Sequence, residues 1–338
     1  MMRLSLQERV FNIPLITVHY IKTFFFPTDL ATGYQWAVKS FTFYQFYLPL
    51  CIVLLFGAAV GVWLYHARKN VQNLKKITFF TIWFLVGMLL HIQVIPLDFT
   101  VADRWFYLPI IGLLGLLGLI FNKVKVQNKF IKLLLFLLCC LLLILLSFRT
   151  IVRNGDWKDG ITLAEHDIKY ASESYSLENY LGVEYYNKGR YAEAQKHFTR
   201  STELAPYWDL NWNYLGLVLE RTGTLQGNNK LINEAKEKYK IAIKNSILND
   251  TPFVSMARLL VYSADPEAKN FIKKALIRYP SSSGLWYYSA ILNYSSNDKQ
   301  KALEDARRAY LSNPYNQEAK VLYEALLLGT PINIEINK

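Results

Sequence analysis

The chain has 338 residues, a formal net charge of +12 and 52% hydrophobic residues, and near residue 152 its composition changes from Leu-, Phe- and Ile-rich to Lys-, Glu- and Asn-rich. This change predicts a membrane domain followed by a water-soluble domain. Much of the positive charge lies in two short loops between apolar runs, so it indicates membrane topology and argues against nucleic-acid binding.

Residues 8–26 form an apolar, aromatic segment with Lys22 near its end. This segment either lies on the outer membrane surface as an amphipathic helix or crosses the membrane as a fifth, short span. We predict the interfacial helix and assign residues 1–43 to an amphipathic segment on the outer face. The chain would then begin outside the membrane, as expected for a fragment of a longer multi-span protein or for one half of a split enzyme.

Four apolar runs within residues 44–152 approach the length of about 20 residues that a helix needs to cross a membrane. They are residues 44–65, 77–97, 105–121 and 133–148. Lys132 and Arg149 flank the last run, where their long side chains can reach the two membrane surfaces. We therefore predict a transmembrane domain of about four helices over residues 44–152, followed by a connecting helix in residues 153–174.

Basic residues in the loops set the predicted orientation. Loops 66–76 and 122–132 contain eight of them, namely Arg68, Lys69, Lys75, Lys76, Lys123, Lys125, Lys129 and Lys132. On the opposite side, loop 98–104, the 15 residues before the first span and the 15 residues after the last span (153–167) carry four, namely Lys39, Arg104, Arg153 and Lys158. Since cytoplasmic loops are enriched in Lys and Arg, we expect loop 98–104 and the C-terminal half on the extracytoplasmic side. The inverted topology, with a cytoplasmic C-terminal half, is the alternative.

Loop 96–109 carries the candidate binding residues of the membrane half. Asp103 and Arg104 lie at the predicted boundary beside aromatic residues that include Tyr107, and His91 lies near the end of the second span. An arginine fork suits the phosphate of a lipid headgroup, so we predict a lipid-phosphate site of Arg104, Asp103, Tyr107 and His91. The alternative is an aromatic belt with a few solvated charges, with His91 packed against a neighbour.

A period of 34 residues runs through residues 175–328. At this period the small and large residues of a helix-turn-helix unit recur, and the pattern is that of the tetratricopeptide repeat (TPR). The recurring residues are Leu181, Gly182, Tyr185, Ala194, Phe198, Pro206, Trp212, Gly216, Ala235, Tyr239, Ala268, Pro280, Trp286, Ala302, Ala309 and Pro314. We predict about four repeats with an extra loop at 222–230, a capping helix at 315–328 and a tail at 329–338. The predicted fold class is therefore all-α, a multi-span helical domain followed by a TPR solenoid.

A TPR array presents a groove that typically binds a protein or peptide partner, although most of its aromatic residues are expected to pack between repeats. The sequence shows no metal-ligand spacing and no phosphate-binding loop, and Cys51, Cys139 and Cys140 lie in apolar runs, so no metal or cofactor is predicted. Asn249 and Asn293 each begin a short N-glycosylation pattern.

Several segments resemble one known family. Residues 102–109 (ADRWFYLP), residues 153–157 (RNGDW) and the repeats that follow occur in the same order as in the transmembrane and TPR-containing protein O-mannosyltransferases and their bacterial relatives, and residues 20–27 (YIKTFFFP) are similar to a segment just upstream. The resemblance implies a GT-C-type fold and transfer of a sugar from a polyprenyl-phosphate carrier to Ser or Thr. The family's catalytic first loop has no match in this chain, so the catalytic residues stay unknown.

Two functions follow as hypotheses. The first is the C-terminal part of a lipid-linked-sugar-dependent glycosyltransferase, whose membrane half holds a polyprenyl-phosphate sugar and whose TPR groove holds a protein acceptor. The second is a non-catalytic, membrane-anchored TPR scaffold for protein–protein interaction. Whether this chain is itself an enzyme is left open, as are the sugar, the acceptor and the oligomeric state.

Overall fold

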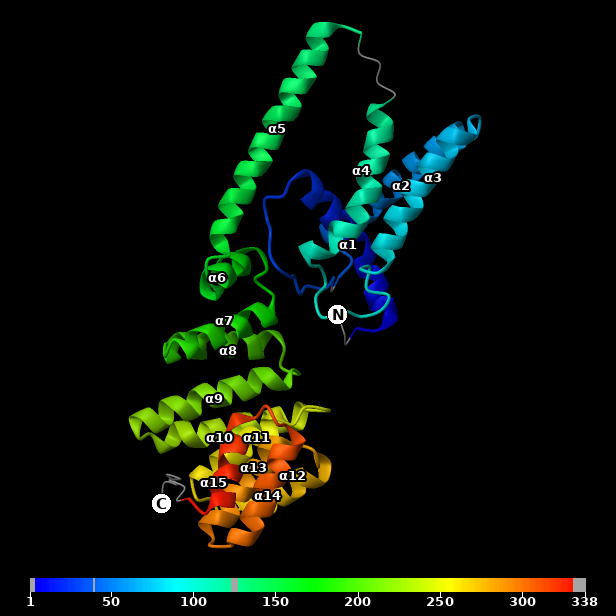
Figure 1. Ribbon diagram of the computed structural model, residues 1–338. Coiled ribbons are helices and arrows are strands. Elements are labelled where there is room, and N and C mark those ends of the chain that lie inside the picture. The colour runs from blue at the N-terminus through cyan, green and yellow to red at the C-terminus, as the bar shows by residue number, and fades with distance from the viewer. Residues whose placement is uncertain (1–3, 39, 123–126, 331–338) are drawn as a thin grey trace. The chain divides into compact units, whose positions relative to one another are not determined.

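The computed structural model describes residues 4–38, 40–122 and 127–330 and is all-helical over them, as predicted, apart from loops and an isolated bridge between Tyr34 and Val101 (Figure 1). Lys39, Lys123 and Lys125 of the predicted topology signals lie outside the described residues. The chain divides into two compact units, Met1–Leu181 and Gly182–Lys338.

The first unit contains the apolar helices. In chain order they are α1 (Leu6–Phe25), the π-helical turn η1 (Phe43–Tyr47) leading into α2 (Leu48–Ala67), α3 (Val71–Leu89), the 3-10 turn η2 (Asp103–Phe106) leading into α4 (Tyr107–Phe121), α5 (Lys129–Asp156) and α6 (Gly160–Tyr170). Among the residues that the structure describes, three segments are long and apolar enough to cross a membrane, namely Phe43–Ala67, Asp103–Phe121 and Lys129–Asp156. They correspond to the first, third and fourth predicted spans.

The second predicted span, residues 77–97, is too long by about two helical turns. Helix α3 ends at Leu89, and its first turns carry Lys75 and Lys76. The chain then turns at Gln93, which has a positive φ of 65°. The Gln93 side chain is fully buried and donates to the carbonyls of Phe99 and Thr100 at 2.8 and 3.0 Å. These hydrogen bonds stabilise a turn where the sequence predicts the last part of the helix.

Helices α3 and α4 pack closely because glycines face the contact. A Cβ atom on Gly112 would lie 2.6 Å from the backbone nitrogen of Phe84, and one on Gly87 would lie 3.0 Å from that of Pro109. Small residues at such contacts let two helix backbones approach.

Two buried clusters fix the ends of this bundle. Ala67, Ile77 and Leu116 form one cluster beside the loop between α2 and α3. At the other end Ile16 and Tyr20 of α1 join a cluster with residues from α3, α4 and the loops between helices. Helix α1 therefore packs at the end of the bundle away from the basic α2–α3 loop.

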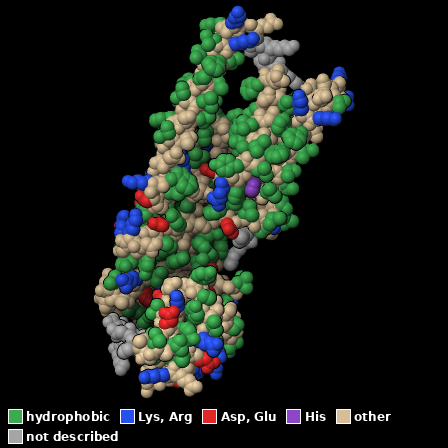
Figure 2. All heavy atoms as spheres, in the orientation of Figure 1, with side chains coloured by type: hydrophobic (Ala, Val, Ile, Leu, Met, Phe, Trp, Pro, Cys, Tyr) green, Lys and Arg blue, Asp and Glu red, His purple; other side chains and the backbone are tan. Residues whose placement is uncertain are grey.

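Helix α5 is the longest apolar element of this unit. It spans 28 residues, about 42 Å at the rise of an α-helix, and no side chain of its most apolar stretch is buried. Figure 2 shows hydrophobic side chains covering the visible face of the apolar helices, with Lys and Arg gathered near the helix ends. An apolar surface of this extent marks contact with a membrane or a partner.

The rest of the chain consists of helix pairs and a last single helix, and the boundary between the two units falls within the first of these helices, after Leu181. The pairs are α7 (Tyr175–Asn187) with α8 (Tyr191–Leu204), α9 (Asp209–Gln226) with α10 (Asn229–Asn245), α11 (Thr251–Tyr262) with α12 (Ala268–Arg278) and α13 (Ser283–Ser295) with α14 (Lys299–Ser312), and α15 (Gln317–Leu328) follows. The extra loop predicted at residues 222–230 is wrong, because α9 stays helical to Gln226 and turns at Gly227, whose φ is +61°. The insertion lengthens a helix instead.

Close approach of small and aromatic residues holds each pair. A Cβ atom on Gly182 would lie 2.6 Å from the ring of Phe198, and one on Gly216 would lie 2.6 Å from the ring of Tyr239. Both rings are fully buried. A hydrogen bond stabilises the turn before the first helix of two of these pairs. Trp212 and Trp286 each donate their indole N–H to the carbonyl of the proline six residues earlier, at 2.8 Å.

Substitution of Gly182 or Gly216 by Ala tests this packing. The added methyl group meets an aromatic ring that has no free space to move into, so each variant should lose about 1–3 kcal/mol of stability. Hydrogen exchange of α7–α10 in the full chain should accelerate accordingly. Gly155→Ala is the control, because its Cβ would meet nothing within 4 Å; equal exchange in all three variants would contradict the packing argument.

Candidate functional site

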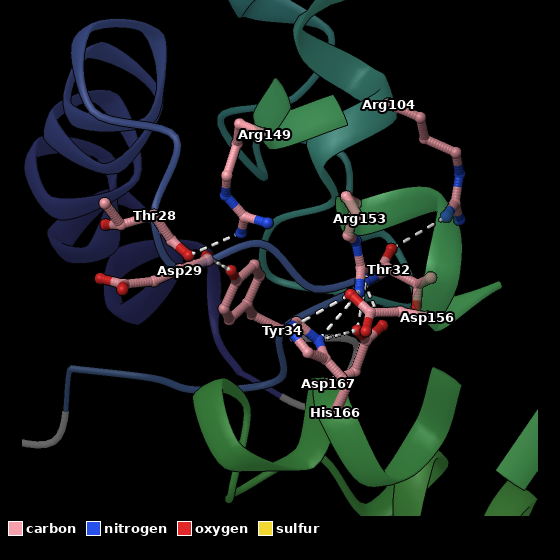
Figure 3. Close-up of polar contacts among 10 residues, drawn as sticks. All are labelled: Thr28, Asp29, Thr32, Tyr34, Arg104, Arg149, Arg153, Asp156, His166 and Asp167. Carbon is pink, nitrogen blue, oxygen red and sulfur yellow. Dashed lines mark hydrogen bonds and ion pairs between the residues drawn. The ribbon is translucent and has the colours of Figure 1, made fainter. Parts of the chain in front are cut away.

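Loop 27–34, which follows α1, is the centre of the polar contacts in the first unit (Figure 3). Arg149 of α5 donates to the carbonyls of Pro27 and Thr28 at 3.1 and 2.9 Å. Arg104 of η2 donates from Nη1 to the carbonyl of Thr32 at 3.0 Å. Two arginines from different apolar helices are thus positioned on one short piece of backbone.

A buried ion pair holds the other face of this loop. Arg153 of α5 contacts Asp167 of α6 at 2.8 Å between Nη2 and Oδ1, and the Asp167 side chain is fully buried. The second carboxylate oxygen of Asp167 accepts the backbone N–H of Thr32 at 2.7 Å. One aspartate therefore connects α5, α6 and loop 27–34.

Asp156 and His166 complete the cluster around Arg153. Asp156 contacts the guanidinium at 3.1 Å, and the His166 ring lies 3.1 Å from Asp167 and 3.4 Å from Asp156. Arg153 occupies the space between these groups, and among the residues that the structure describes no cluster of His, Cys, Asp or Glu is suited to a metal ion. The arrangement is that of a structural ion-pair network.

Charge and burial also shape the start of the loop. A hydrogen bond from Lys22, 2.8 Å long, lowers the pKa of Asp29 below its ordinary value. Burial raises the pKa of Tyr34, so its hydroxyl stays protonated and donates to the carbonyl of Asp29. Loop 27–34 is therefore stabilised by a hydrogen bond between two of its own residues as well as by side chains from η2, α5 and α6.

The four residues of the predicted lipid-phosphate site have different surroundings. Arg104 is exposed and reaches loop 27–34, and the neighbouring Asp103 has a buried Oδ1 without a hydrogen-bond partner among the described residues. Tyr107 is 77% exposed at the start of α4. His91 instead stacks on Trp105, with ring centres 5.3 Å apart and an angle of 12° between the planes.

Arg149, Arg153 and Asp167 are the site residues that sequence reasoning missed. The sequence pattern assigns Arg149 to the membrane surface, and it assigns Arg153 to the count of basic residues and to the RNGDW segment, but neither to a site. The conjunction of that segment with an aspartate eleven positions beyond Asp156 is the signal that could have drawn attention to them. Arg149 and Asp167 contact loop 27–34 across more than a hundred residues of sequence, which no local pattern reveals.

The repeat unit has a separate candidate site. A cavity of about 580 Å³ lies between the first two helix pairs, lined among others by Arg190, Tyr191, Glu193 and Leu225. In the same unit Arg258 contacts Glu220 at 2.9 Å, where burial opposes its charge but Glu220 raises its pKa above the ordinary value.

Removal of the Asp167 carboxylate tests the buried ion pair. Asp167→Ala leaves Arg153 charged, buried and without this partner, and loss of one member of such a pair costs about 3–5 kcal/mol. Hydrogen exchange of residues 27–34 should rise strongly, whereas the exposed Lys169→Ala on the same helix should leave it unchanged. The double variant Arg153→Met, Asp167→Leu should recover part of the protection. Full protection in Asp167→Ala would show that the pair does not hold the loop.

Comparison with known proteins finds that part of the chain is similar to tetratricopeptide repeats and to protein O-mannosyl-transferases. A family model of the tetratricopeptide repeat matches residues 177–208. Protein O-mannosyl-transferase TMTC3 of Homo sapiens is 24% identical over 270 residues, which cover 66% of this chain and 29% of that protein. Protein O-mannosyl-transferase Tmtc2 of Drosophila melanogaster is 34% identical over 108 residues, covering 32% of this chain and 11% of that protein. Because 186 of the 338 residues follow residue 152, the match to the human protein extends into the apolar half.

Solved TPR structures are similar to part of the chain. The thermophilic TPR protein TTC0263 of Thermus thermophilus has a TM-score of 0.45 and 15% identity, covering 53% of this chain and 94% of that chain. YrrB, a TPR protein with an unusual peptide-binding site, has a TM-score of 0.36 and 17% identity, covering 53% of this chain and 87% of that chain. The chain spans less than a third of the length of the human transferase. The resemblance to protein O-mannosyl-transferases is confirmed at low identity and over part of their length, and the second unit carries tetratricopeptide repeats.

Proposed function

We propose that this chain is a membrane-anchored TPR protein that takes part in sugar transfer from a polyprenyl-phosphate carrier to a protein. The observation that carries the proposal is the similarity to the human transferase across both the apolar half and the repeats. In this proposal the first unit of the chain holds the donor lipid, and the repeat unit holds the protein acceptor or a partner.

The arginines of the first unit supply the donor site of this proposal. Arg104 lies at the start of one candidate span, Arg149 directly follows the uncharged stretch of another, and both bond to loop 27–34. A guanidinium carries five N–H donors, so bonds to a carbonyl leave donors for phosphate oxygens. Low-dielectric surroundings at a membrane boundary strengthen such charge-assisted contacts. Asp103 and Tyr107 adjoin Arg104 and belong to the same proposed site, with His91 stacked behind Trp105.

The orientation of the chain is part of the proposal. Basic residues of the α2–α3 loop lie on the cytoplasmic side, and loop 27–34 and the repeat unit lie on the extracytoplasmic side. The orientation puts Arg104 and Arg149 on the face where a lipid-linked sugar would meet a translocated protein.

A second candidate is a membrane-anchored TPR scaffold without catalysis. The observation that favours it is a repeat unit that is compact in itself and has its own cavity of about 580 Å³.

A transfer assay separates the two functions. Membranes containing this chain, alone or with a co-expressed multi-span transferase segment, receive labelled polyprenyl-phosphate mannose and a Ser/Thr-rich acceptor. Transfer under either condition supports the first function, and absence of transfer under both supports the scaffold.

Donor binding gives a direct test of the arginines. Arg104→Gln and Arg149→Gln should each weaken binding of a polyprenyl-phosphate sugar about tenfold to a hundredfold, since a hydrogen bond to a charged group contributes about 1.5–3 kcal/mol. Binding is measured on the purified full chain in nanodiscs. Arg68→Gln is the control, because Arg68 lies over the Tyr65 ring at the opposite end of the bundle. If all three variants lost the same affinity, the loss would reflect the lower positive charge of the chain and would contradict a specific site at Arg104 and Arg149.

The two N-glycosylation patterns test the orientation. Asn249 lies partly exposed in the loop before α11, whereas Asn293 is 7% exposed in α13 and donates to Asp305 at 2.8 Å. If the repeat unit is extracytoplasmic, expression in a eukaryotic cell should give a glycosidase-sensitive band that Asn249→Gln removes and Asn293→Gln leaves. A chain without glycan, whose repeats are digested by protease after selective permeabilisation of the plasma membrane, would establish the cytoplasmic orientation.

A further inference from the structure

Three exposed aliphatic side chains lie on two adjoining segments of the repeat unit. Ile247 and Leu248 follow α10 and are 73% and 90% exposed, and Ile277 in the last turn of α12 is 78% exposed. Arg278 joins the two segments, because its guanidinium donates to the carbonyls of Ser246 and Ile247 at 2.8 and 3.2 Å. A single exposed aliphatic residue is ordinary, whereas a group of them indicates an interaction surface.

Buried contacts fix both segments. The Arg278 guanidinium lies 5.2 Å from the centre of the Phe253 ring, and the opposite face of α12 is buried through Ala268, Ile272 and Ala275. In the loop after α10 the Ser246 hydroxyl donates to the Asn249 carbonyl at 2.6 Å. The exposed aliphatic side chains therefore extend from backbone whose position is set by the packing of the unit.

The exposed face of α12 is basic around Ile277. The helix contains four basic residues and no acidic one. Successive helical residues are rotated by about 100°, so Lys273 and Lys274 flank Ile277 one turn earlier. Their side chains are exposed, as is that of Lys244 in the last turn of α10, and none of these lysines forms an ion pair with a residue that the structure describes.

We call this region the α12 surface; it comprises Lys244, Ile247, Leu248, Lys269, Lys273, Lys274 and Ile277. The acidic residues that precede α12 are neutralised, since Asp265 and Glu267 contact Lys236 at 2.6 and 3.7 Å. Asp250 follows Leu248 closely in sequence, against four lysines, so the surface keeps a positive charge.

Exposed aliphatic groups among unpaired lysines fit an anionic lipid bilayer better than a protein. Lysine is depleted in protein–protein interfaces, and a second copy of this chain would set lysine against lysine. At a membrane surface, aliphatic side chains enter the boundary between headgroups and acyl chains, while lysines contact lipid phosphates and bury their own apolar stems. A bilayer is also the partner nearest to hand, because three segments of the same chain are suited to cross one.

We propose that the α12 surface docks on an anionic lipid bilayer, with Ile247, Leu248 and Ile277 in the headgroup region and the lysines on lipid phosphates. The inference is independent of sugar transfer, because it applies equally to a part of a transferase and to a scaffold. Docking would restrict the movement of the repeat unit relative to the membrane and so limit the partners that its helix pairs can meet.

Vesicle binding by the full chain tests the proposal. The chain is produced in a bacterial host without N-glycosylation, since Asn249 adjoins Leu248, and is placed in nanodiscs of neutral phosphatidylcholine. The discs should sediment with sucrose-loaded vesicles of phosphatidylcholine and phosphatidylglycerol, more weakly with phosphatidylcholine alone, and less as salt is raised. In nanodiscs of the anionic mixture, hydrogen exchange of residues 246–249 should be slower than in neutral discs.

Substitutions on the α12 surface should weaken vesicle binding. The double variant Lys273→Gln, Lys274→Gln should lose about tenfold to thirtyfold in affinity, and Leu248→Ser about tenfold. Two controls on other elements of the repeat unit should bind as the wild type does. Lys188→Gln with Lys196→Gln removes the same charge, and Leu225→Ser removes a 58% exposed leucine near the opposite end of α10.

The contrary results are distinct. If the wild-type chain neither bound anionic vesicles nor gained protection in anionic discs, the proposal would be overturned, as it would by equal losses in the test and control variants. Association of discs with one another, abolished by Leu248→Ser and without vesicle binding, would assign the surface to a second copy and reject the bilayer. Circular dichroism checks that each variant is folded, and Ile277→Ser repeats the test on the second segment.

Discussion

Backbone groups at the end of an apolar helix need hydrogen-bond partners, and in the first unit loop 27–34 finds them in side chains that come from distant helices. Arg104, Arg149 and Asp167 bond to carbonyls and an N–H of this loop. An unpaired buried backbone group costs as much as a lost hydrogen bond, so these side chains decide where the loop can lie. The positions of α5, α6 and α1 around it follow.

The two units are stabilised by different kinds of contact. The repeat unit buries a regular series of alanines, glycines and aromatic rings, so each helix pair depends mainly on its neighbours. The first unit leaves much of its apolar surface exposed and concentrates its buried polar contacts at one end. The repeat unit therefore tolerates an inserted helical turn at Thr222–Gln226, whereas the first unit depends on a few charged residues.

The parts of the fold that sequence predicts are those governed by local periodicity. A period of 34 residues predicts the helix pairs, and uninterrupted apolar length predicts three helices that can cross a membrane. The end of α3 escaped prediction because residues 90–97 are apolar, and only the buried amide of Gln93 turns the chain there. The insertion after Leu219 reads as a loop because it contains two glycines, although packing against α10 keeps it helical. The contacts of Arg149 and Asp167 with loop 27–34 depend on segments that lie far apart in sequence, and no pattern of spacing contains that information.

Arg149 joins loop 27–34 to the length of α5, and this has a consequence for bilayer thickness. The uncharged stretch of α5, residues 133–148, covers about 24 Å, whereas a typical hydrocarbon core is about 30 Å thick. In a thick bilayer Lys132 and Arg149 would be drawn inward, and Arg149 could stretch toward the headgroups only by releasing the carbonyls of Pro27 and Thr28. In a thin bilayer the Arg149 guanidinium can reach the headgroups and keep its hydrogen bonds to Pro27 and Thr28 at the same time. The order of this loop would then vary with the membrane in which the chain resides.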